Sequence, residues 1–492
     1  MQIMSKISLE KYFIGLSKDS LIYGSGNAVL RILALLTAPI FTRIFVPAEY
    51  GIISLISSVI SFLSLLLIFG MDNAIFVSYY QYKKERKEII SSAFWFLALW
   101  GLFWAGTASI FSGNLSTLIF KTPIYKPLFL LTFTTAYLTL LVNLAKTVFR
   151  LEFKAKTFAI IAGLNALAST GLMILFVVYF KKGLTGYFTG SLIGTFVTLL
   201  IALYLVRKNL KFKISWPRLK EMLAFGAMVV PASISFFVFD LSDRFFLNQY
   251  RTLDEIGLYS IGINIASLLI FFSYALGQAW SPQVMNIYFS SKKIFKQFVP
   301  RFFIYYLLFF FYLAVMLSVF SQEILRIFAT EKFYGAAVVI PSLAIAMVFS
   351  ASNQVTSLGI TLSKKTKYFA IYTALAALLN IGLNFLLIPR YGMVGAGWAT
   401  ASSYLFLTVA YFTISQRFIR LALDWQKIIK LVFLSLGAIF LFPLTWQFGF
   451  WGNLAVKILE MAGLLALLYL SGVIEGQEIG YLRKYIRRIF FH

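Results

Sequence analysis

Residues 183–206 read Gly183-Leu-Thr-Gly-Tyr-Phe-Thr-Gly-Ser-Leu-Ile-Gly-Thr-Phe-Val-Thr-Leu-Leu-Ile-Ala-Leu-Tyr-Leu-Val206, and Arg207-Lys208 follow directly. The stretch contains no charged side chain. A helix needs about 20 consecutive apolar residues to cross the hydrocarbon core of a bilayer. We therefore predict that residues 183–206 form a transmembrane helix that ends at a basic loop.

The same pattern recurs along the whole chain. Hydrophobic residues make up 60% of the 492 residues and charged residues 13%, and the mean hydropathy is +0.85. Since backbone groups in hydrocarbon must be hydrogen-bonded within the protein, the expected fold class is an all-α integral membrane protein. We predict fourteen transmembrane helices, at residues 21–42, 51–71, 89–111, 127–145, 157–180, 183–206, 222–248, 256–280, 302–320, 336–359, 367–389, 392–415, 431–450 and 453–473.

The basic residues orient these predicted helices. Most of the 44 Lys and Arg belong to the two ends of the chain and to every second loop, at 83–88, 146–156, 207–220, 292–301, 364–367 and 417–430. The positive-inside rule places these loops and both termini in the cytoplasm. This distribution explains the formal net charge of +26 without nucleic acid as a partner. Residues 481–491 are expected to form a basic amphipathic helix that contacts membrane lipids.

Two residue types that often carry chemistry are nearly absent. The chain has no Cys, and its one His is the last residue, His492. We therefore expect no disulfide, no metal site, no cofactor and no histidine proton relay. If transport is coupled to H⁺ or Na⁺, Asp or Glu must carry the coupling. The first apolar stretch is long enough to span and lacks a small-residue cleavage pattern, so a signal peptide is not expected.

An internal repeat suggests how the predicted helices are grouped. Lys156-Thr-Phe-Ala-Ile160 is echoed by Lys367-Tyr-Phe-Ala-Ile371, and Gly171-Leu172 by Gly382-Leu383. The copies lie six predicted helices apart, so both would cross the membrane in the same direction. Chance similarity among apolar helices is the alternative. We interpret the chain as two parallel six-helix lobes, an N-lobe (helices 1–6) in 1–215 and a C-lobe (helices 7–12) in 216–425, with helices 13–14 and a basic cytoplasmic tail in 426–492.

Several motifs resemble one known family of membrane proteins. They are Arg43-Ile-Phe-Val-Pro-Ala-Glu-Tyr-Gly51, Phe225-Gly-Ala-Met-Val-Val-Pro231, Asp243-Arg-Phe-Phe-Leu247, Glu255-Ile-Gly-Leu-Tyr-Ser260 and Ile388-Pro-Arg-Tyr-Gly392. These stretches are similar to parts of the bacterial polysaccharide-unit flippases of the O-antigen and capsule type. That family belongs to the MOP exporter superfamily, with MATE exporters and lipid II flippases as relatives. Val77 and Met228 depart from the family pattern, which often has an arginine and a proline there.

The resemblance implies a MATE/MOP-like fold and a transporter without covalent chemistry, so not an enzyme. The implied substrate is an undecaprenyl-diphosphate-linked oligosaccharide, a polysaccharide repeat unit such as that of O-antigen in lipopolysaccharide. It would be flipped from the inner to the outer leaflet of the bacterial inner membrane by alternating access. Polysaccharide assembly proteins are further candidate partners.

Two arginines are the candidates for binding the diphosphate. Arg31 lies about 18 Å into the first predicted helix at 1.5 Å per residue, too deep to reach either surface easily. A guanidinium suits a diphosphate, while a buried ion pair with a carboxylate is the alternative for Arg31. Arg244 is the second candidate, near the outer interface, where a local ion pair or snorkelling explains it equally well.

Carboxylates and amides in the predicted helices or at their ends complete the candidate site. Asp240, Asp243 and Asp72 are the candidates for ion coupling, with local ion pairing as the alternative. Asn353, Gln354, Asn380 and Asn384 are candidate cavity residues that could hydrogen-bond sugar hydroxyls. The alternative for these amides is polar contact between helices.

Three other functions share parts of this pattern. A MATE-type drug exporter would have the same fold, but a cationic drug requires an unpaired carboxylate in the cavity, and the chain has Arg31 instead. A lipid II flippase would handle the same diphosphate carrier and stays open. A membrane glycan polymerase or transferase would need carboxylates or histidines gathered in a sizeable outer loop, whereas the predicted outer loops are short.

Overall fold

The structure is a computed structural model that describes residues 37–441 and 450–474. Along these residues the chain is helical with short connections and has no strand, so the expected all-α class is confirmed for this part of the chain. Arg31, most of the first predicted helix at 21–42 and the basic tail lie outside the described residues.

Eleven helices of the described chain are long and apolar enough to cross a membrane, as expected for a multi-pass membrane protein. One of them, α16 (Lys367–Phe418), contains two of the predicted helices, 367–389 and 392–415. They are separated at Gly392, whose φ of 56° and ψ of −136° are not helical. The predicted total of fourteen stays a prediction, since parts of the first and thirteenth predicted helices are not described.

The chain packs as two compact units. The first comprises residues up to Ser260 with Phe328–Lys332, and the second comprises Ile261–Ile327 with the residues from Phe333 onward. The first unit ends later than the N-lobe boundary expected at residue 215, because α9 packs on α2, α3 and α4. The two six-helix lobes and their relation by a repeat stay a prediction.

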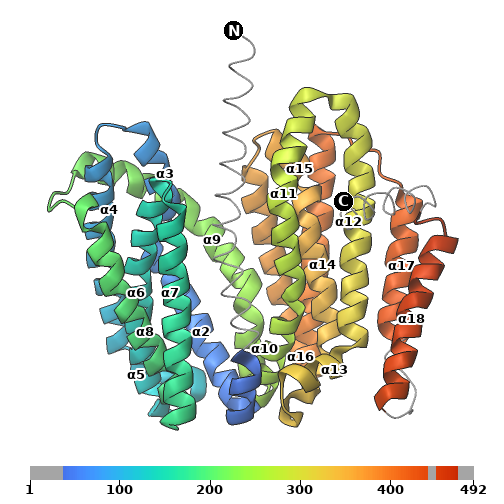
Figure 1. Cartoon of the computed structure of the whole chain (residues 1–492), viewed down its shortest axis with the longest axis horizontal. Helices are drawn as coiled ribbons and strands as arrows, with labels where there is room; N and C mark the ends of the chain where they lie inside the picture. The colour runs from blue at the N-terminus through green and yellow to red at the C-terminus, as the bar shows by residue number, and fades with distance from the viewer. Residues whose placement is uncertain (1–36, 442–449, 475–492) are drawn as a thin grey trace, which may run out of the picture. The chain divides into compact units, whose positions relative to one another are not determined.

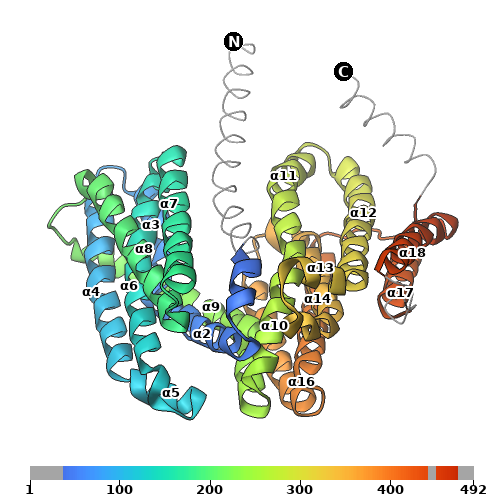
Figure 2. The same cartoon turned by 60° about the horizontal axis from the view of Figure 1, so that its bottom comes forward.

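The first unit is a bundle in which α4, α6, α8 and α7 run side by side in both views (Figures 1 and 2). Its α8 coincides with the predicted helix 183–206. The helices of this unit are α2 (Pro47–Ile68), α3 (Met71–Gln81), α4 (Arg86–Ile110), α5 (Ser112–Phe120), η1 (Pro123–Tyr125), α6 (Lys126–Leu151), α7 (Ala155–Ile174), the π-helical turn η2 (Leu175–Tyr179), α8 (Gly183–Val206), η3 (Arg207–Asn209), α9 (Trp216–Tyr250) and the first part of α10 (Leu253–Ala266).

The second unit is built around α12, α14 and α16, which pack on one another. Its helices are α11 (Leu268–Ser290), α12 (Lys292–Val319), α13 (Ser321–Phe328, which ends in the first unit), η4 (Glu331–Val338), α14 (Ile340–Thr356), α15 (Leu358–Leu362), α16, α17 (Trp425–Leu441) and α18 (Phe450–Leu470). Within this unit α17 packs on α12, and α18 packs on α17. Lys457 of α18 forms an ion pair with Glu323 of α13, with Nζ 2.8 Å from Oε1.

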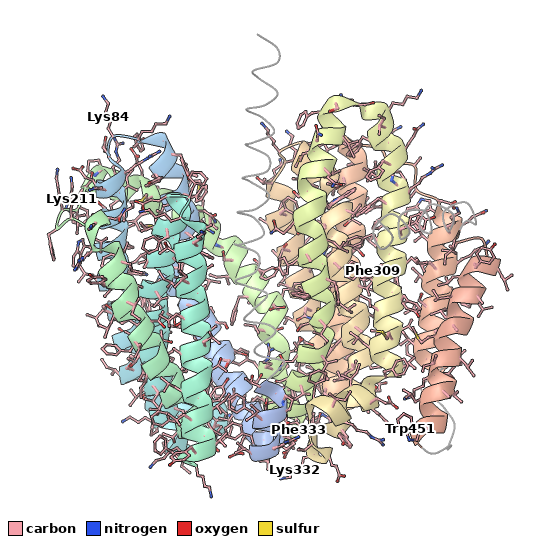
Figure 3. The ribbon with its side chains drawn as sticks, in the orientation of Figure 1. Lys84, Lys211, Phe309, Lys332, Phe333 and Trp451 are labelled. Atoms are coloured by element: carbon pink, nitrogen blue, oxygen red, sulfur yellow. The ribbon has the colours of Figure 1, made fainter. Side chains whose placement is uncertain are left out.

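The basic residues of the first unit lie where the charge pattern requires. Lys84 and Lys211 belong to two loops predicted on the cytoplasmic side, and both lie at the same end of the unit (Figure 3). Lys332, predicted on the outer side, lies at the opposite end (Figure 3). The two kinds of loop are therefore separated between the two ends of this unit, as the loop charges predict, and which end is cytoplasmic stays a prediction.

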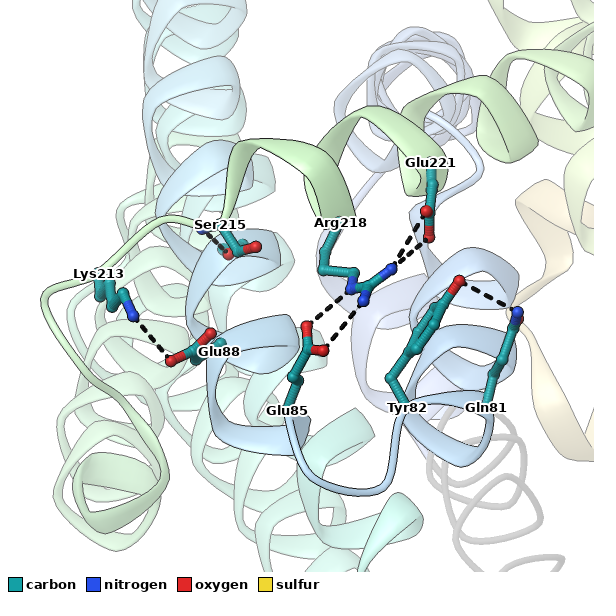
Figure 4. Close-up of polar contacts among 9 residues, drawn as sticks. Gln81, Tyr82, Glu85, Glu88, Lys213, Ser215, Arg218 and Glu221 are labelled. Atoms are coloured by element: carbon teal, nitrogen blue, oxygen red, sulfur yellow. Dashed lines mark hydrogen bonds and ion pairs between the residues drawn. The ribbon is translucent and has the colours of Figure 1, made fainter.

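The N-terminal end of α9 is held against the connection between α3 and α4 (Figure 4). Arg218 donates two hydrogen bonds to Glu85, from Nε to Oε2 at 2.7 Å and from Nη2 to Oε1 at 2.9 Å. The guanidinium also lies 3.2 Å from Glu221 and 3.6 Å from the centroid of the Tyr82 ring. A planar guanidinium suits this combination of paired and stacked contacts better than an ammonium.

The helices α2 and α10 meet through two glycines, one on each helix. A Cβ atom on Gly257 would lie 1.9 Å from the carbonyl oxygen of Pro47, and one on Gly51 would lie 2.1 Å from the carbonyl oxygen of Leu253. Because backbone atoms stand in the way, no side chain fits at either position without a shift of the helices. This contact brings the polar side chains of α2 and α10 together.

We expect Gly257→Ala to destabilise the protein by about 1–3 kcal/mol, because the added methyl group must push α10 away from Pro47. Gly171→Ala is the matched control, since a Cβ on Gly171 would meet no atom within 4 Å. Melting curves of the purified protein in detergent measure both. Equal melting temperatures for the two variants would contradict this account.

The ion pair at α9 predicts a pH dependence of stability. The hydrogen bonds from Arg218 lower the pKa of the Glu85 carboxyl below its ordinary value. A group with a lowered pKa stabilises the folded state above its ordinary pKa and loses this effect as the pH falls through the lowered value. We therefore expect Arg218→Gln to lower the melting temperature at neutral pH, and the difference from wild type to shrink below about pH 4.

Lys220→Gln is the control for this pH series, because it removes an exposed cation of the same helix that has no ion pair among the described residues. Its melting temperature should follow that of the wild type from acid to neutral pH. A constant deficit of Arg218→Gln at every pH would argue against the ion pair as the cause.

Candidate functional site

A bend between α2 and α3 positions the first group of candidate residues. Phe69 and Gly70 have left-handed backbones, with φ of 50° and 66°. A Cβ on Gly70 would lie 2.5 Å from the carbonyl oxygen of Gly226, so the bend rests on the backbone of α9. Glycine is the residue that tolerates both demands. Beyond the bend, α3 begins at Met71 and turns Asp72 toward α6.

An open pocket of about 530 Å³ lies between α3 and the end of α6. Asn73, Phe76 and Tyr80 have the spacing of one face of α3 and line it together with Arg150 and Phe153. The guanidinium carbon of Arg150 lies 5.5 Å from the centroid of the Phe76 ring. The Tyr80 hydroxyl donates a hydrogen bond of 3.0 Å to the carbonyl oxygen of Leu151, which ties α3 to the end of α6.

The charges beside this pocket are unequal. Lys146 and Arg150 lie one turn apart on α6, and both are in electrostatic contact with Asp72. Arg150 is exposed and forms no ion pair within the described part of the chain. Two cations therefore face one carboxylate. The pocket is therefore suited to bind a ligand in which an anionic group adjoins an apolar one.

The second group, Asp243 and Arg244, belongs to a buried hydrogen-bond network. The Asp243 side chain is only 2% exposed, and its carboxylate accepts a hydrogen bond from the Tyr259 hydroxyl. Arg244 donates from Nε to the Ser54 hydroxyl oxygen at 2.8 Å, and the hydroxyl oxygens of Ser54 and Ser260 lie 2.7 Å apart. The network thus joins α9 to α2 and α10, about one turn along from the glycine contact of α2 with α10.

The structure places Asp240 and Asp243, which the sequence groups as ion-coupling candidates, in different surroundings. Asp243 is enclosed by protein, whereas Asp240, one turn earlier on α9, is exposed and in electrostatic contact with Arg244. Nη1 of Arg244 is buried and has no hydrogen-bond partner among the described residues. Of the two aspartates on α9, Asp243 is therefore the one that is enclosed in this network.

The four candidate amides lie in helix contacts of the second unit. Gln354 donates from Nε2 to the carbonyl and hydroxyl oxygens of Ser273, both at 2.9 Å, which joins α14 to α11. Asn353 accepts a hydrogen bond of 3.0 Å from Thr408 of α16. Asn384 donates to Asn380 one turn away at 3.0 Å, and both side chains are fully buried. The structure thus places these amides in the packing of α11, α14 and α16.

Sequence reasoning missed Lys146 and Arg150 as site residues because it ended the fourth predicted helix at residue 145. In the structure α6 continues to Leu151, so both cations are helical. Their spacing of four residues, among apolar side chains, was the available signal. Hydropathy marks the apolar length of a helix and not its end, which explains the error.

Comparisons with known proteins identify the relatives of the chain. A family model described as polysaccharide biosynthesis protein matches residues 40–338. The probable low-salt glycan biosynthesis flippase Agl15 of Haloferax volcanii is 25% identical over 245 residues, which cover 48% of this chain and 50% of the relative. The uncharacterized membrane protein MJ1068 of Methanocaldococcus jannaschii is 23% identical over 225 residues, or 43% of this chain and 44% of the relative. The chain spans about half the length of the curated relatives it matches.

Two solved structures define the fold. The lipid II flippase MurJ in an inward closed conformation is similar with a TM-score of 0.70 and 18% identity, over 92% of this chain and all of that one. An inward-facing MATE multidrug transporter of the MOP superfamily has a TM-score of 0.66 and 14% identity, over 79% of this chain and 94% of that one. The MATE/MOP-like fold implied by the resemblance is therefore confirmed.

The buried network predicts a stability change that is separate from transport. We expect Tyr259→Phe to destabilise the protein by about 1–3 kcal/mol, because it removes a hydrogen bond to the buried Asp243 carboxylate. Tyr179→Phe is the control, since Tyr179 is 76% exposed in the same unit. Melting temperatures in detergent compare the two, and an unchanged value for Tyr259→Phe would mean that the network contributes nothing to stability.

Proposed function

Because the chain belongs to the family of polysaccharide biosynthesis proteins, we propose that it is a transporter that flips a lipid-linked glycan across the membrane and not an enzyme. The MATE/MOP-like fold supports a transporter, and one relative is named a probable glycan biosynthesis flippase. In detail, the substrate is a polysaccharide repeat unit on undecaprenyl diphosphate, moved from the inner to the outer leaflet of a bacterial inner membrane, with both termini of the protein in the cytoplasm.

The observation that carries this proposal is the open pocket with Arg150. A diphosphate carries its negative charge on oxygens that a guanidinium can bind with paired hydrogen bonds. Arg150 offers such a guanidinium at the rim of an open pocket, and Lys146 adds a second cation. Phe76 and Phe153 supply apolar surface for the first part of the carrier chain. This pocket lies near the loops predicted to be cytoplasmic, where the substrate is made.

The step across the membrane is assigned to alternating access. The diphosphate first binds at Arg150 and then moves to Arg31, which the sequence predicts deep in the first helix. Binding at successive cations keeps the charged group solvated by protein while the polyprenyl chain stays in lipid. Asp240 is the preferred candidate for H⁺ or Na⁺ coupling because Asp243 is held in the buried hydrogen-bond network, with Asp72 as the alternative beside the two cations.

Drug export and lipid II transport are the competing functions. A cationic drug would require an unpaired carboxylate, whereas Asp72 is offset by Lys146 and Arg150, and Asp240 is in electrostatic contact with Arg244. Lipid II has a diphosphate too, so the same pocket would suit it. The choice between polysaccharide unit and lipid II depends on the sugar, which calls for chemical identification of the substrate.

The test begins with deletion of the gene in its host and extraction of lipid-linked glycans. We expect one lipid-linked glycan to accumulate, and its sugar composition identifies the substrate. The wild-type gene should clear the accumulated lipid, whereas Arg150→Gln should leave it in place, with transport reduced about tenfold or more because a charged hydrogen-bonded contact is lost. Arg31→Ala should have the same effect.

Lys84→Gln serves as the control variant, because Lys84 is an exposed cation at the same end of the first unit and does not line the pocket. It should clear the lipid as the wild type does. The amount of each variant in the membrane is measured by immunoblotting. Full clearance by both Arg150→Gln and Arg31→Ala would refute the binding path, and altered drug sensitivity without any accumulated lipid would favour a drug exporter.

A further inference from the structure

Two adjoining pockets lie in the second unit, at the ends of α12, α16 and α17. Their volumes are about 570 and 450 Å³, and both are lined by Lys296 and Ala422. All three helices belong to this one unit. Most of the residues that line them belong to the loops 292–301 and 417–430, which the charge pattern predicts on the cytoplasmic side. No candidate residue of the transport site lies among those that line them.

The pockets carry an excess of positive charge. Lys296 and Arg420 line the first pocket, while Arg301 and Lys427 line the second together with Asp424. Lys296, Arg301 and Arg420 are exposed, and none of them forms an ion pair with another described residue. Three cations are thus available to a ligand.

The one carboxylate nearby is already engaged. Asp424 precedes α17, and its Oδ1 accepts a hydrogen bond of 3.1 Å from the backbone N–H of Lys427. This is the arrangement of a helix N-cap, in which the aspartate side chain serves the backbone. Asp424 therefore reduces the positive charge of the pockets without filling them.

The connection between α16 and α17 is held in a defined conformation. The amide of Gln416 accepts a hydrogen bond of 2.8 Å from the N–H of Leu421 and donates one of 2.9 Å to its carbonyl oxygen. These two bonds position the backbone that carries Arg420 and Ala422. These hydrogen bonds therefore help to fix the shape of both pockets.

Apolar and aromatic side chains form the other wall. Phe412 and Trp425 pack edge to face, with ring centroids 5.4 Å apart, and both line the first pocket. Trp425 is 53% exposed, and Ile429 and Phe433 further along α17 are 64% and 75% exposed. An exposed tryptophan followed by exposed apolar residues is typical of a helix that leaves the interface and enters lipid.

We propose that these pockets bind the head group of an anionic phospholipid from the surrounding leaflet. Lys296, Arg301 and Arg420 bind the phosphate, and the acyl chains follow the exposed apolar side of α17. Basic pockets between transmembrane helices on the cytoplasmic side are suited to such head groups. The lipid would fasten α17 to α12 and α16, and the site is separate from the transport of glycan.

A titration of phospholipid tests this inference on the purified full chain. Native mass spectrometry counts the bound molecules of phosphatidylglycerol and of neutral phosphatidylcholine. We expect phosphatidylglycerol to bind the wild type more tightly and to raise its melting temperature. The triple variant Lys296→Gln, Arg301→Gln and Arg420→Gln should bind phosphatidylglycerol about tenfold more weakly or worse, since three cations near the phosphate are lost.

The matched control is the triple variant Lys364→Gln, Lys365→Gln and Lys367→Gln. It removes the same charge from the same unit, at exposed residues before and at the start of α16 that line neither pocket. It should retain the affinity of the wild type. Equal losses in the two triple variants would mean that net charge and not the pocket decides binding, and would overturn the proposal.

Two further measurements use the wild-type protein and do not depend on folding of a variant. A photoactivatable phosphatidylglycerol should label the peptide that contains residues 412–427, and labelling confined to other peptides would refute the site. Inorganic phosphate should not reproduce the rise in melting temperature. If phosphate alone produces the whole effect, the site binds a free anion and not a lipid.

Discussion

The interior of a bilayer supplies no hydrogen-bond partner, and the rest of this structure depends on that constraint. Every backbone group in the hydrocarbon must be paired within the protein, which the helices achieve residue by residue. Polar side chains obey the same rule locally. Ser58, Thr198 and Ser352 each donate to the carbonyl oxygen one turn earlier, at 2.9, 2.9 and 2.7 Å. Small polar residues can therefore occupy buried helix faces without a distant partner.

Groups that cannot pair locally join helices instead. Asp243 receives the Tyr259 hydroxyl, Arg244 reaches Ser54, and Lys457 pairs with Glu323. These contacts lie within compact units and hold their helices together. Arg150 differs from them because it is exposed at the rim of an open pocket, with no ion pair among the described residues. A cation in this position is available to an anionic substrate, which is why the proposed function depends on it.

The candidate site could be predicted only in part. The sequence named Asp72 as a candidate for ion coupling, but the cations that face it belong to α6, 74 and 78 positions later by their numbering, at Lys146 and Arg150. No periodicity within one helix reports such a neighbour. Gln354 and Asn353 show a second limit of the sequence. Composition alone does not distinguish an amide that lines a cavity from one that hydrogen-bonds to Ser273 or Thr408 on another helix. Arg31 stays a prediction from the sequence.

The sequence by itself determined the helical class, the position of helices such as α8 and the distribution of basic loops between the two ends of the first unit. It could do so because the length of an apolar stretch and the charge of a loop are local properties of the sequence. The bilayer responds to both of them directly. Only the tertiary structure decided that α9 packs with the first unit, that Asp243 is enclosed and that Arg150 opens onto a pocket. Those outcomes depend on contacts between residues far apart in the chain. The packing of side chains between helices determines these contacts.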